Sequence, residues 1–242
     1  MGVLLKRVFD ILCAVAGLVF LSPLMLWIAW RIKREDGGPV FYRGERVVLH
    51  GKPFRIFKFR TMVVDAEKIG ASSTSDDDPR ITRTGRVLRK YKLDELPQLI
   101  DVLKGDRSLV GPRPNVEREV ALYTEEERKH QNARPGITGL ASIVFSDEGD
   151  ILAGSDDPDL KYNQIIRPWK SHLGLLCASR RSLFLDIQII GITAVAIFSR
   201  GMALRGVQKL LDSLEADEKL RAVAKREHPL VPAPPPGKIV TS

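Results

Sequence analysis

The sequence predicts a mainly helical α+β fold. An apolar run of helical length occupies residues 11–30, and the stretch 37–62 has the short apolar and aromatic runs and turn glycines of β structure. Helical patterns separated by Gly/Pro turns fill most of the remainder. The chain has 242 residues, of which 44% are hydrophobic and 28% are charged. It is therefore long enough to bury a core of its own.

The positive charge of the chain is concentrated near its N-terminus. The formal net charge is +8, and residues 1–60 hold 11 Lys/Arg against 4 Asp/Glu, whereas residues 61–242 hold 27 against 26. The basic excess therefore surrounds the apolar run. This pattern favours an anionic membrane surface over nucleic acid. We expect a phospholipid membrane as a partner, and no nucleic acid.

The apolar run is predicted to enter the membrane as a re-entrant hairpin. Pro23 lies inside it, where proline removes a backbone hydrogen bond and clashes with the preceding turn. A helix broken at Ser22–Pro23 has arms of about 18 Å and 10 Å, and neither crosses a hydrocarbon core of about 30 Å. Ser22 would satisfy backbone groups freed at the break. Basic residues flank both ends, and the positive-inside rule then places both ends in the cytoplasm: Lys6, Arg7, Arg31, Lys33 and Arg34.

The run has two other interpretations. A kinked helix that spans the bilayer stays open. A cleaved signal peptide is disfavoured, because the Ser-Pro pair is followed by more apolar residues. We divide the chain into a re-entrant membrane hairpin (1–35), a compact cytosolic domain with a small β element and interfacial amphipathic helices (36–200), and a charged helix with a proline-rich tail (201–242).

Alternation of side chains in FRIFKFR predicts a strand with two unlike faces. Phe57 and Phe59 would face the core, whereas Lys58 and Arg60 would form a basic face. The polar stretch 65–79 is predicted to be a mobile loop. The stretch 80–105 predicts two helices that meet near an Asp-Glu pair.

The C-terminal half is predicted to be mostly helical. Residues 117–131 have a helical pattern. The apolar run 182–198 has arginines at both ends, which favours a helix on or in the membrane interface, with a core helix as the alternative. Residues 203–228 predict one amphipathic, charged helix, and the proline-rich tail that follows is predicted to be disordered.

The stretch RKYKLDELPQL, residues 89–99, carries the strongest chemical signal. Asp94 and Glu95 follow three basic residues, and Pro97 comes two residues later. Asp94 as a helix N-cap is the ordinary interpretation. The alternative is chemical, since a carboxylate held beside phosphate-binding cations can attack phosphorus or ligate Mg²⁺. The cations available are Lys58, Arg60, Arg89 and Arg113.

Arg113 has features that suit phosphate binding. Its planar fork of donors suits phosphate oxygens. Pro112 and Pro114 flank it and stiffen the backbone, which lowers the entropy lost on binding. Nearby cations would also keep Asp94 ionised.

Other chemical signals in the sequence are weak. Neither Cys13 nor Cys177 lies in a C-x-x-C spacing. We interpret both as small apolar residues in a protein of a reducing compartment. No P-loop, dinucleotide fingerprint or nucleophile elbow is found, and the four histidines have no metal-ligand spacing. Two D-x-D patterns, Asp76–Asp78 and Asp157–Asp159, lie in polar stretches and are expected to be plain acidic loops.

Four stretches closely resemble the bacterial sugar transferases, the small monotopic polyprenol-phosphate phosphoglycosyl transferases. They are KRVFD…SP, GKPFRIFKFRTM, DPRITRTGRVLRKYKLDELPQLIDVLKGDRSLVGPRP and RPGITG. The resemblance covers roughly residues 5–200, and its LDELPQL…KGD.SLVGPRP block is long and specific. It implies a re-entrant N-terminal helix broken at Ser-Pro.

The resemblance also implies a reaction. A UDP-sugar would donate its sugar-1-phosphate to undecaprenyl phosphate, and UMP would leave. The product would be a lipid-linked diphosphate sugar at the cytoplasmic face of the bacterial inner membrane. This is the first membrane step of exopolysaccharide, O-antigen or glycoprotein glycan synthesis. Candidate protein partners are downstream glycosyltransferases and a second copy of the chain.

Residue roles follow from the same resemblance. Asp94 would be the nucleophile and form a phosphosugar–aspartyl intermediate, and Glu95 would position or deprotonate the incoming lipid phosphate. Mg²⁺ would bridge the diphosphate, with Asp94 as its protein ligand. The implied substrate-binding residues are Lys58, Arg89, Pro112, Arg113 and Pro114; the implied membrane residues are Lys6, Arg7, Ser22 and Pro23.

The chain departs from the common family pattern in three places. Arg107 stands where methionine is usual, and LASIVFSDEGDIL follows PGITG where an aromatic, a glutamine and a Gly-Arg pair are usual. The residues from about 201 onward are additional. No residue after Gly139 is therefore assigned a role.

The sequence leaves two rival functions. One is a non-enzymatic membrane-surface adaptor that recruits glycan-assembly partners. The other is a metal-dependent glycosyltransferase that uses a D-x-D pair and releases UDP rather than UMP. Nucleotide-sugar binding separates the adaptor from both enzymes, and the released nucleotide separates the enzymes from each other.

Overall fold

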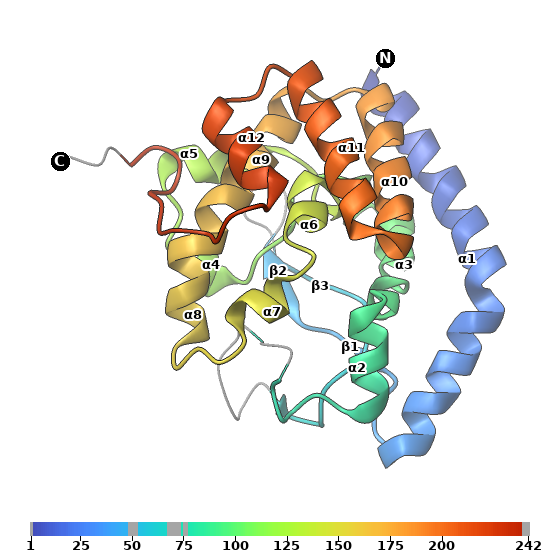
Figure 1. The fold of residues 1–242 in the computed structure, drawn as a ribbon. Helices are drawn as coiled ribbons and strands as arrows, with labels where there is room; N and C mark the ends of the chain where they lie inside the picture. The colour runs from blue at the N-terminus through green and yellow to red at the C-terminus, as the bar shows by residue number, and fades with distance from the viewer. Residues whose placement is uncertain (1, 48–52, 67–73, 75–76, 239–242) are drawn as a thin grey trace.

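A computed structural model describes residues 2–47, 53–66, 74 and 77–238. One long helix, α1 (Gly2–Asp36), runs along one side of a mainly helical domain that contains three two-stranded sheets (Figure 1). This arrangement confirms the predicted α+β, mainly helical class. His50 and Asp76, together with most of the predicted loop 65–79, lie outside the described residues.

The predicted β element forms two short antiparallel pairs. β1 (Phe41–Tyr42) pairs with β4 (Lys58–Phe59), so that Tyr42 lies opposite Lys58. β2 (Glu45–Val47) pairs with β3 (Pro53–Arg55). A third, parallel pair joins β5 (Ser108–Val110) to β6 (Gly136–Thr138). This last pairing fixes the loop after β5 beside the start of α6.

The prediction of two helices meeting near the Asp-Glu pair is confirmed. α2 (Arg83–Lys90) ends just before a 3₁₀ turn, η3 (Leu93–Glu95), and α3 (Gln98–Lys104) follows. Thr82 caps α2 by accepting a 3.0 Å hydrogen bond from Gly85 N. Lys92 has a left-handed backbone (φ 55°) and makes the sharp turn from α2 into η3.

The C-terminal half is a set of helices around the main apolar core. They are α4 (Glu117–Val120), α5 (Glu125–Arg128), η4 (Lys129–Asn132), α6 (Leu140–Val144), α7 (Glu148–Leu152), α8 (Pro158–Lys161), the π-helix η5 (Tyr162–Ile166), α9 (Arg167–Ser179), α10 (Leu183–Phe198), α11 (Arg200–Ser213) and α12 (Glu218–Lys225). Leu140, Leu173 and Leu211 are completely buried in this core.

Two predictions for the last forty residues are wrong. The region 203–228 holds two helices rather than one, because Glu215 takes a left-handed conformation (φ 53°) and Asp217 caps α12. The described part of the proline-rich tail is bound to the domain, since Ala233 N donates to Gln164 O and Thr124 Oγ1 donates to Pro236 O, at 3.1 Å and 2.5 Å.

Helix α1 is continuous, which corrects the predicted break at Ser22–Pro23. Pro23 has no N–H to donate to Val19 O, the carbonyl one turn earlier. Ser22 Oγ donates to that carbonyl at 2.8 Å instead, as expected for a serine that compensates for a proline. Figure 1 shows a curved helix. Among the described residues, this helix alone is long and apolar enough to cross a membrane.

The N-terminal end of α1 is bound to the domain. Asp10 is buried and accepts hydrogen bonds from Ser108 Oγ at 2.8 Å and from Leu109 N at 3.2 Å. Arg7 donates to the carbonyls of Val102 and Leu103, at 2.7 Å and 3.0 Å, near the C-terminal end of α3. A cation is favourable there because it satisfies exposed carbonyls and opposes the helix dipole.

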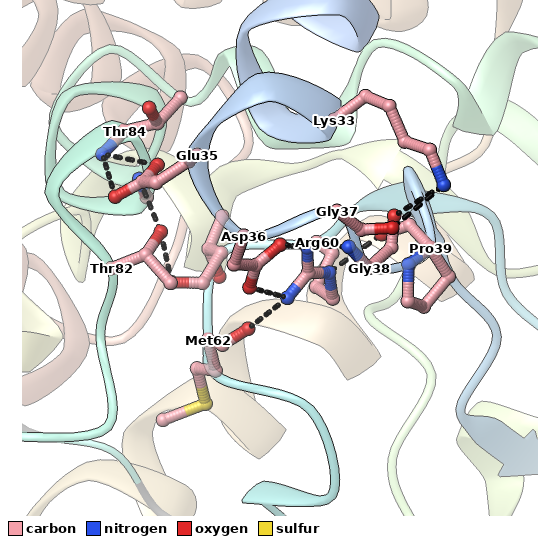
Figure 2. Close-up of polar contacts among 12 residues, drawn as sticks. Lys33, Glu35, Asp36, Gly37, Gly38, Pro39, Arg60, Met62, Thr82 and Thr84 are labelled. Carbon is pink, nitrogen blue, oxygen red and sulfur yellow. Dashed lines mark hydrogen bonds and ion pairs between the residues drawn. The ribbon is translucent and has the colours of Figure 1, made fainter.

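The C-terminal end of α1 is bound to the same domain (Figure 2). Glu35 accepts from the backbone N–H groups of Arg83 and Thr84, at 2.9 Å and 3.2 Å, and so caps α2. Asp36 accepts from Arg60, with an Nη1–Oδ2 distance of 2.6 Å. Arg60 is buried, which corrects the prediction that it lies on a basic face with Lys58.

The outer side of α1 remains apolar and exposed. Pro23 lies near its middle, and Ile28 and Ile32 pack on Phe59 and Leu88 on the inner side. Helix α10 likewise buries one side and exposes another, so the described structure carries two apolar helical surfaces. The large exposed residues are Val3, Leu4, Leu5, Val8, Leu12, Val15, Val19, Phe20, Leu26, Trp27 and Trp30 on α1, and Phe184, Ile187, Ile197 and Phe198 on α10.

Candidate active site

Three elements bring the predicted site residues together. Strand β4 supplies Lys58, the 3₁₀ turn η3 supplies Asp94 and Glu95, and the loop after β5 supplies Arg113. The loop is tethered to β6, because Gly111 N donates to Thr138 O and Gly136 N donates to Pro112 O, both at 3.0 Å. Pro112 and Pro114 are buried on either side of the exposed Arg113.

Glu95 is the acceptor in this group. Its Oε1 accepts from Lys58 Nζ at 2.8 Å and from Arg113 Nη2 at 2.9 Å. Burial alone would raise the pKa of Glu95, but the charges of Arg113 and Lys58 outweigh it and hold the pKa well below its usual range. Glu95 is therefore ionised at neutral pH.

Asp94 has a different environment although it is the adjacent residue. It is 6% exposed, and its Oδ2 lies 3.6 Å from Lys58 Nζ. Its buried Oδ1 has no hydrogen-bond partner among the described residues. Burial raises the pKa of Asp94, and Lys58 opposes this rise while the charge of Glu95 adds to it. One oxygen of Asp94 thus receives no hydrogen bond from the described residues.

The predicted cap role of Asp94 is not found. The residue before α3 is Pro97, which supplies no side-chain cap, and Asp94 lies one turn earlier in η3. Arg89 is half-buried on α2, and its charge lowers the pKa of Asp94, so it belongs to the same electrostatic group. Lys58 and Arg113 thus contact Glu95, Lys58 also lies near Asp94, and the charge of Arg89 acts on Asp94.

The residues present fit a metal ion that is held mainly by substrate. No group of three or more His, Cys, Asp or Glu side chains in the described ranges is arranged to hold a metal. Asp94 Oδ1, buried and without a partner, is a suitable single ligand. Mg²⁺ usually binds through one or two carboxylates together with substrate phosphates. The site therefore fits Mg²⁺ delivered with a diphosphate, and not an all-protein metal cage.

The described carboxylates of the two D-x-D patterns form hydrogen bonds or ion pairs with other residues of the protein. Asp78 accepts from Arg80 Nη2 at 2.6 Å. Asp157 caps α8 through Leu160 N, and Asp159 pairs with Arg118 at 3.2 Å. Asp78 lies in an irregular stretch, as predicted, whereas Asp157 and Asp159 begin helix α8, which corrects the prediction of a loop there.

The residues named as membrane contacts lie as follows. Lys6 pairs with Asp186 of α10 and donates to Val110 O at 3.4 Å, and Arg7 binds α3. Both cations therefore also fasten α1 to the domain. Ser22 and Pro23 lie in the middle of the helix.

Sequence reasoning missed three further charged residues. Lys92 precedes η3, Glu148 begins α7 and Lys170 lies on α9. The charges of Lys92 and Arg113 both act on Glu148. No spacing in the sequence connects residue 113 with residues 148 and 170. The ion pair between Glu148 and Lys170 joins α7 to α9.

Comparison with known proteins shows which proteins this chain is similar to. A family model described as bacterial sugar transferase matches residues 1–200. An undecaprenyl-phosphate galactose phosphotransferase of Salmonella typhimurium is 42% identical over 161 residues, which are 60% of this chain and 34% of that protein. An uncharacterized sugar transferase, EpsL, of Bacillus subtilis is 45% identical over 140 residues, covering 58% and 68% of the two chains.

A third relative extends over more of the chain. An undecaprenyl-phosphate glucose phosphotransferase of Komagataeibacter xylinus is 39% identical over 208 residues, which are 81% of this chain and 36% of that protein. The chain thus spans about a third of the length of the Salmonella and Komagataeibacter relatives. The family match covers most of the chain and includes every residue of the Asp94–Glu95 site. The chain belongs to the bacterial sugar transferase family.

Proposed function

We propose that this protein transfers sugar-1-phosphate from a UDP-sugar to undecaprenyl phosphate and releases UMP. The observation that carries the proposal is the unequal pairing of two adjacent carboxylates. Glu95 is held by two cations, whereas buried Asp94 has an oxygen with no partner in the described structure. The names of the Salmonella and Komagataeibacter relatives support the same acceptor and the same kind of transfer.

The reaction proceeds through two displacements at one phosphorus. An oxygen of Asp94 attacks the sugar-proximal phosphorus, the phosphorus–oxygen bond to UMP breaks, and a phosphosugar–aspartyl intermediate forms. A phosphate oxygen of undecaprenyl phosphate then attacks that phosphorus, and the bond to Asp94 breaks. Two half-reactions let a soluble substrate and a membrane lipid use one site in turn.

The cations orient the phosphates and stabilise the developing charge. Arg113 uses one donor on Glu95, and its other donors have no partner in the described structure, so they are available to phosphate oxygens. Lys58 and Arg89 add positive charge on the Asp94 side. Mg²⁺, when bound with the diphosphate, supplies charge neutralisation, and Asp94 would be its protein ligand.

Glu95 acts by positioning rather than as a base. A general base works best with a pKa near the operating pH. The pKa of Glu95 lies well below its usual range because of Arg113 and Lys58. Its fixed negative charge instead holds both cations 2.8–2.9 Å away in the orientation that phosphate requires.

The membrane arrangement is part of the proposal. Both ends of α1 bind one domain, through Asp10 and Asp36, while the middle of its outer side is apolar and exposed. A single folded domain lies on one side of a bilayer, so both ends of α1 stay on that side. We place the domain on the cytoplasmic face of the inner membrane, where its product enters glycan synthesis. Downstream glycosyltransferases and a second copy of the chain are the proposed protein partners.

Product identity tests the proposal. Detergent-purified protein is incubated with undecaprenyl phosphate, Mg²⁺ and a panel of UDP-sugars, and UMP and UDP are quantified separately. Lipid-dependent UMP release with one donor is the expected result, and it names the sugar. UDP release would favour the D-x-D glycosyltransferase. No nucleotide-sugar binding at all would favour the adaptor.

A further inference from the structure

A cavity lies between the N-terminal part of α1 and the helices α9 and α10. Its lining includes Lys6 of α1, Ala178 of α9, Asp186 of α10 and Gly111 of the loop after β5. Figure 1 shows α1 and α10 side by side. The exposed residue Arg181 is also part of the lining, so the cavity opens to the surface. We call it the α1–α10 cavity.

The lining of the α1–α10 cavity has an excess of positive charge. Its charged residues are Lys6, Arg134, Arg181 and Asp186, which leaves a net charge of +2 from three cations and one carboxylate. Lys6 is ion-paired with Asp186, so the carboxylate is already used. Arg181 donates to the carbonyl of Asn132 at 3.3 Å. The Arg134 side chain has no hydrogen bond or ion pair in the part of the chain that the structure describes.

The two arginines of the lining suit a phosphate group. Burial lowers the pKa of Arg181, and the charge of Asp186 opposes that fall. A bound anion would offset the cost of burying the cation. The planar fork of donors on each guanidinium matches phosphate oxygens, and most of these donors are unused.

The size of the cavity limits what can enter it. Its volume is about 40 Å³. That is room for about three water molecules, which is enough for a phosphate group and too little for a nucleotide. The cavity therefore fits the phosphate of a larger molecule whose remainder lies outside.

The surroundings of the cavity indicate what that remainder is. Val3 and Leu4 lie within one turn of Lys6 on α1, and both are exposed. On α10, the exposed residues Phe184 and Ile187 flank the part of the helix that lines the cavity. Acyl chains can pack on such surfaces, whereas a soluble phosphate gains nothing from them. Basic pockets between membrane helices on the cytoplasmic side are typical sites for anionic lipid headgroups.

We propose that the α1–α10 cavity binds the phosphate group of an anionic phospholipid. Arg134 and Arg181 contact the phosphate, and the acyl chains lie against α1 and α10. The site is separate from the proposed active site, because Asp94, Glu95 and Arg113 do not line the cavity. A bound headgroup would fix the N-terminal end of α1 at the level of the lipid phosphates. The inference concerns membrane attachment and does not depend on the proposed reaction.

Lipid binding to the full chain tests the proposal. Native mass spectrometry of the detergent-solubilised protein measures the affinity for dioleoyl phosphatidylglycerol, and for the zwitterionic dioleoyl phosphatidylcholine as a comparison. The variants are Arg134→Gln, Arg181→Gln and the double variant. The matched control combines Arg180→Gln with Arg205→Gln, which removes two exposed arginines that do not line the cavity. Thermal unfolding is recorded for every protein.

A second pair of variants changes the wall of the cavity and keeps both arginines. Ala178→Glu adds a negative charge at the wall, and Ala178→Gln adds a side chain of nearly the same size without a charge. Ala178→Glu should weaken phosphatidylglycerol binding more than Ala178→Gln does, because its carboxylate repels the phosphate or pairs with the arginines. This comparison decides the question even if an arginine variant fails to fold.

The wild-type protein is expected to bind a single phosphatidylglycerol molecule more tightly than phosphatidylcholine. Each Arg→Gln change in the cavity should lower the affinity by about tenfold or more, the effect of losing a hydrogen bond between charged groups. The Arg180→Gln, Arg205→Gln control should stay close to wild type. An equal loss in the control would show general charge attraction and overturn the inference, as would unchanged affinity in the Arg134→Gln, Arg181→Gln double variant.

Three competition results would also overturn it. Equal affinity for phosphatidylcholine would remove the preference for an anionic lipid. Binding of glycerol 3-phosphate as tightly as phosphatidylglycerol would assign the cavity to a soluble phosphate. Displacement of phosphatidylglycerol by an equimolar amount of undecaprenyl phosphate would assign it to the acceptor lipid. None of these measurements uses nucleotide release, so this inference and the proposed function can fail separately.

Discussion

Lys58 donates a 2.8 Å hydrogen bond to Glu95. The same ammonium lies 3.6 Å from Asp94, so its main partner is the second carboxylate of the pair and not the first. Two neighbouring acids on one 3₁₀ turn thereby acquire opposite properties, since the pKa of Glu95 is lowered and that of Asp94 is raised. This asymmetry underlies the first three predictions.

Asp94→Asn should abolish turnover. The amide has nearly the same shape but no negative charge with which to attack phosphorus, so kcat should fall by about 10⁴-fold or more. UMP release at saturating donor measures the loss, and thermal unfolding should show a folded protein. Asp212→Asn, an exposed site on α11, is the matched control and should keep wild-type activity. Normal turnover in Asp94→Asn would remove the nucleophile assignment.

Glu95→Gln should impair the enzyme by weakening the hold on both cations. Losing one partner of a buried charge pair costs several kcal/mol, which corresponds to about a 100-fold fall in kcat/KM. Glu95→Asp keeps the charge but shortens the side chain, so it should recover part of the activity. If Glu95→Gln retains near-normal kcat/KM, Glu95 serves only the fold of η3.

The pH dependence of kcat/KM should reflect the ionisation of Asp94. Its carboxylate must be ionised to attack, and burial raises its pKa above the ordinary value of about 3.9. The activity is therefore lost as the pH falls through this raised pKa. Lys58→Met removes a charge that lowers the pKa of Asp94, so the acid limb of kcat/KM should move to higher pH. Lys58→Arg should leave the limb close to its wild-type position, and an unmoved limb in Lys58→Met would contradict this account.

Arg60→Met should destabilise the protein more than a comparable surface change. It leaves Asp36 without its cation, at a cost of about 3 kcal/mol in the free energy of unfolding, the low end for a broken buried pair because Asp36 is one-third exposed. Arg55→Met breaks an exposed pair with Glu45 and should cost less than about 1 kcal/mol. Denaturant unfolding in detergent compares the two, and equal costs would show that the Asp36–Arg60 pair does not anchor α1.

Topology should place both ends of α1 on one side of the membrane. In a background with Cys13 and Cys177 replaced by alanine, single cysteines are introduced as Gly2→Cys and Arg34→Cys. Both should be protected from a membrane-impermeant thiol reagent in intact cells and labelled after lysis. Labelling of the residue 2 cysteine alone in intact cells would show that the helix spans the bilayer.

Much of this site is visible in the sequence because it is local. The position of Asp94 and Glu95 between two helices follows from periodicity over residues 80–105, and Pro112 and Pro114 mark Arg113 directly. Which of the two carboxylates is paired depends on its contact with Lys58, which precedes Glu95 by 37 residues in the chain. Periodicity carries no information about such a contact.

The errors have the same origin. A proline predicts a broken helix, but the Ser22–Val19 hydrogen bond lets α1 continue. An alternating strand predicts that Arg60 is exposed, but Arg60 is buried and pairs with Asp36. A proline-rich tail predicts disorder, but Thr124 and Gln164 bind its backbone. In each case a distant or single side-chain contact overrode a sound local preference.

The attachment of α1 at both ends also bears on bilayer thickness. A free spanning helix responds to a thicker or thinner bilayer by tilting. Tilting α1 would break the Asp10–Ser108 contact at one end or the Asp36–Arg60 contact at the other. The depth of its apolar side is therefore set by the shape of the folded domain rather than by hydrophobic matching. The distance between the Asp94 site and the lipid headgroups should stay constant across membranes of different acyl-chain length.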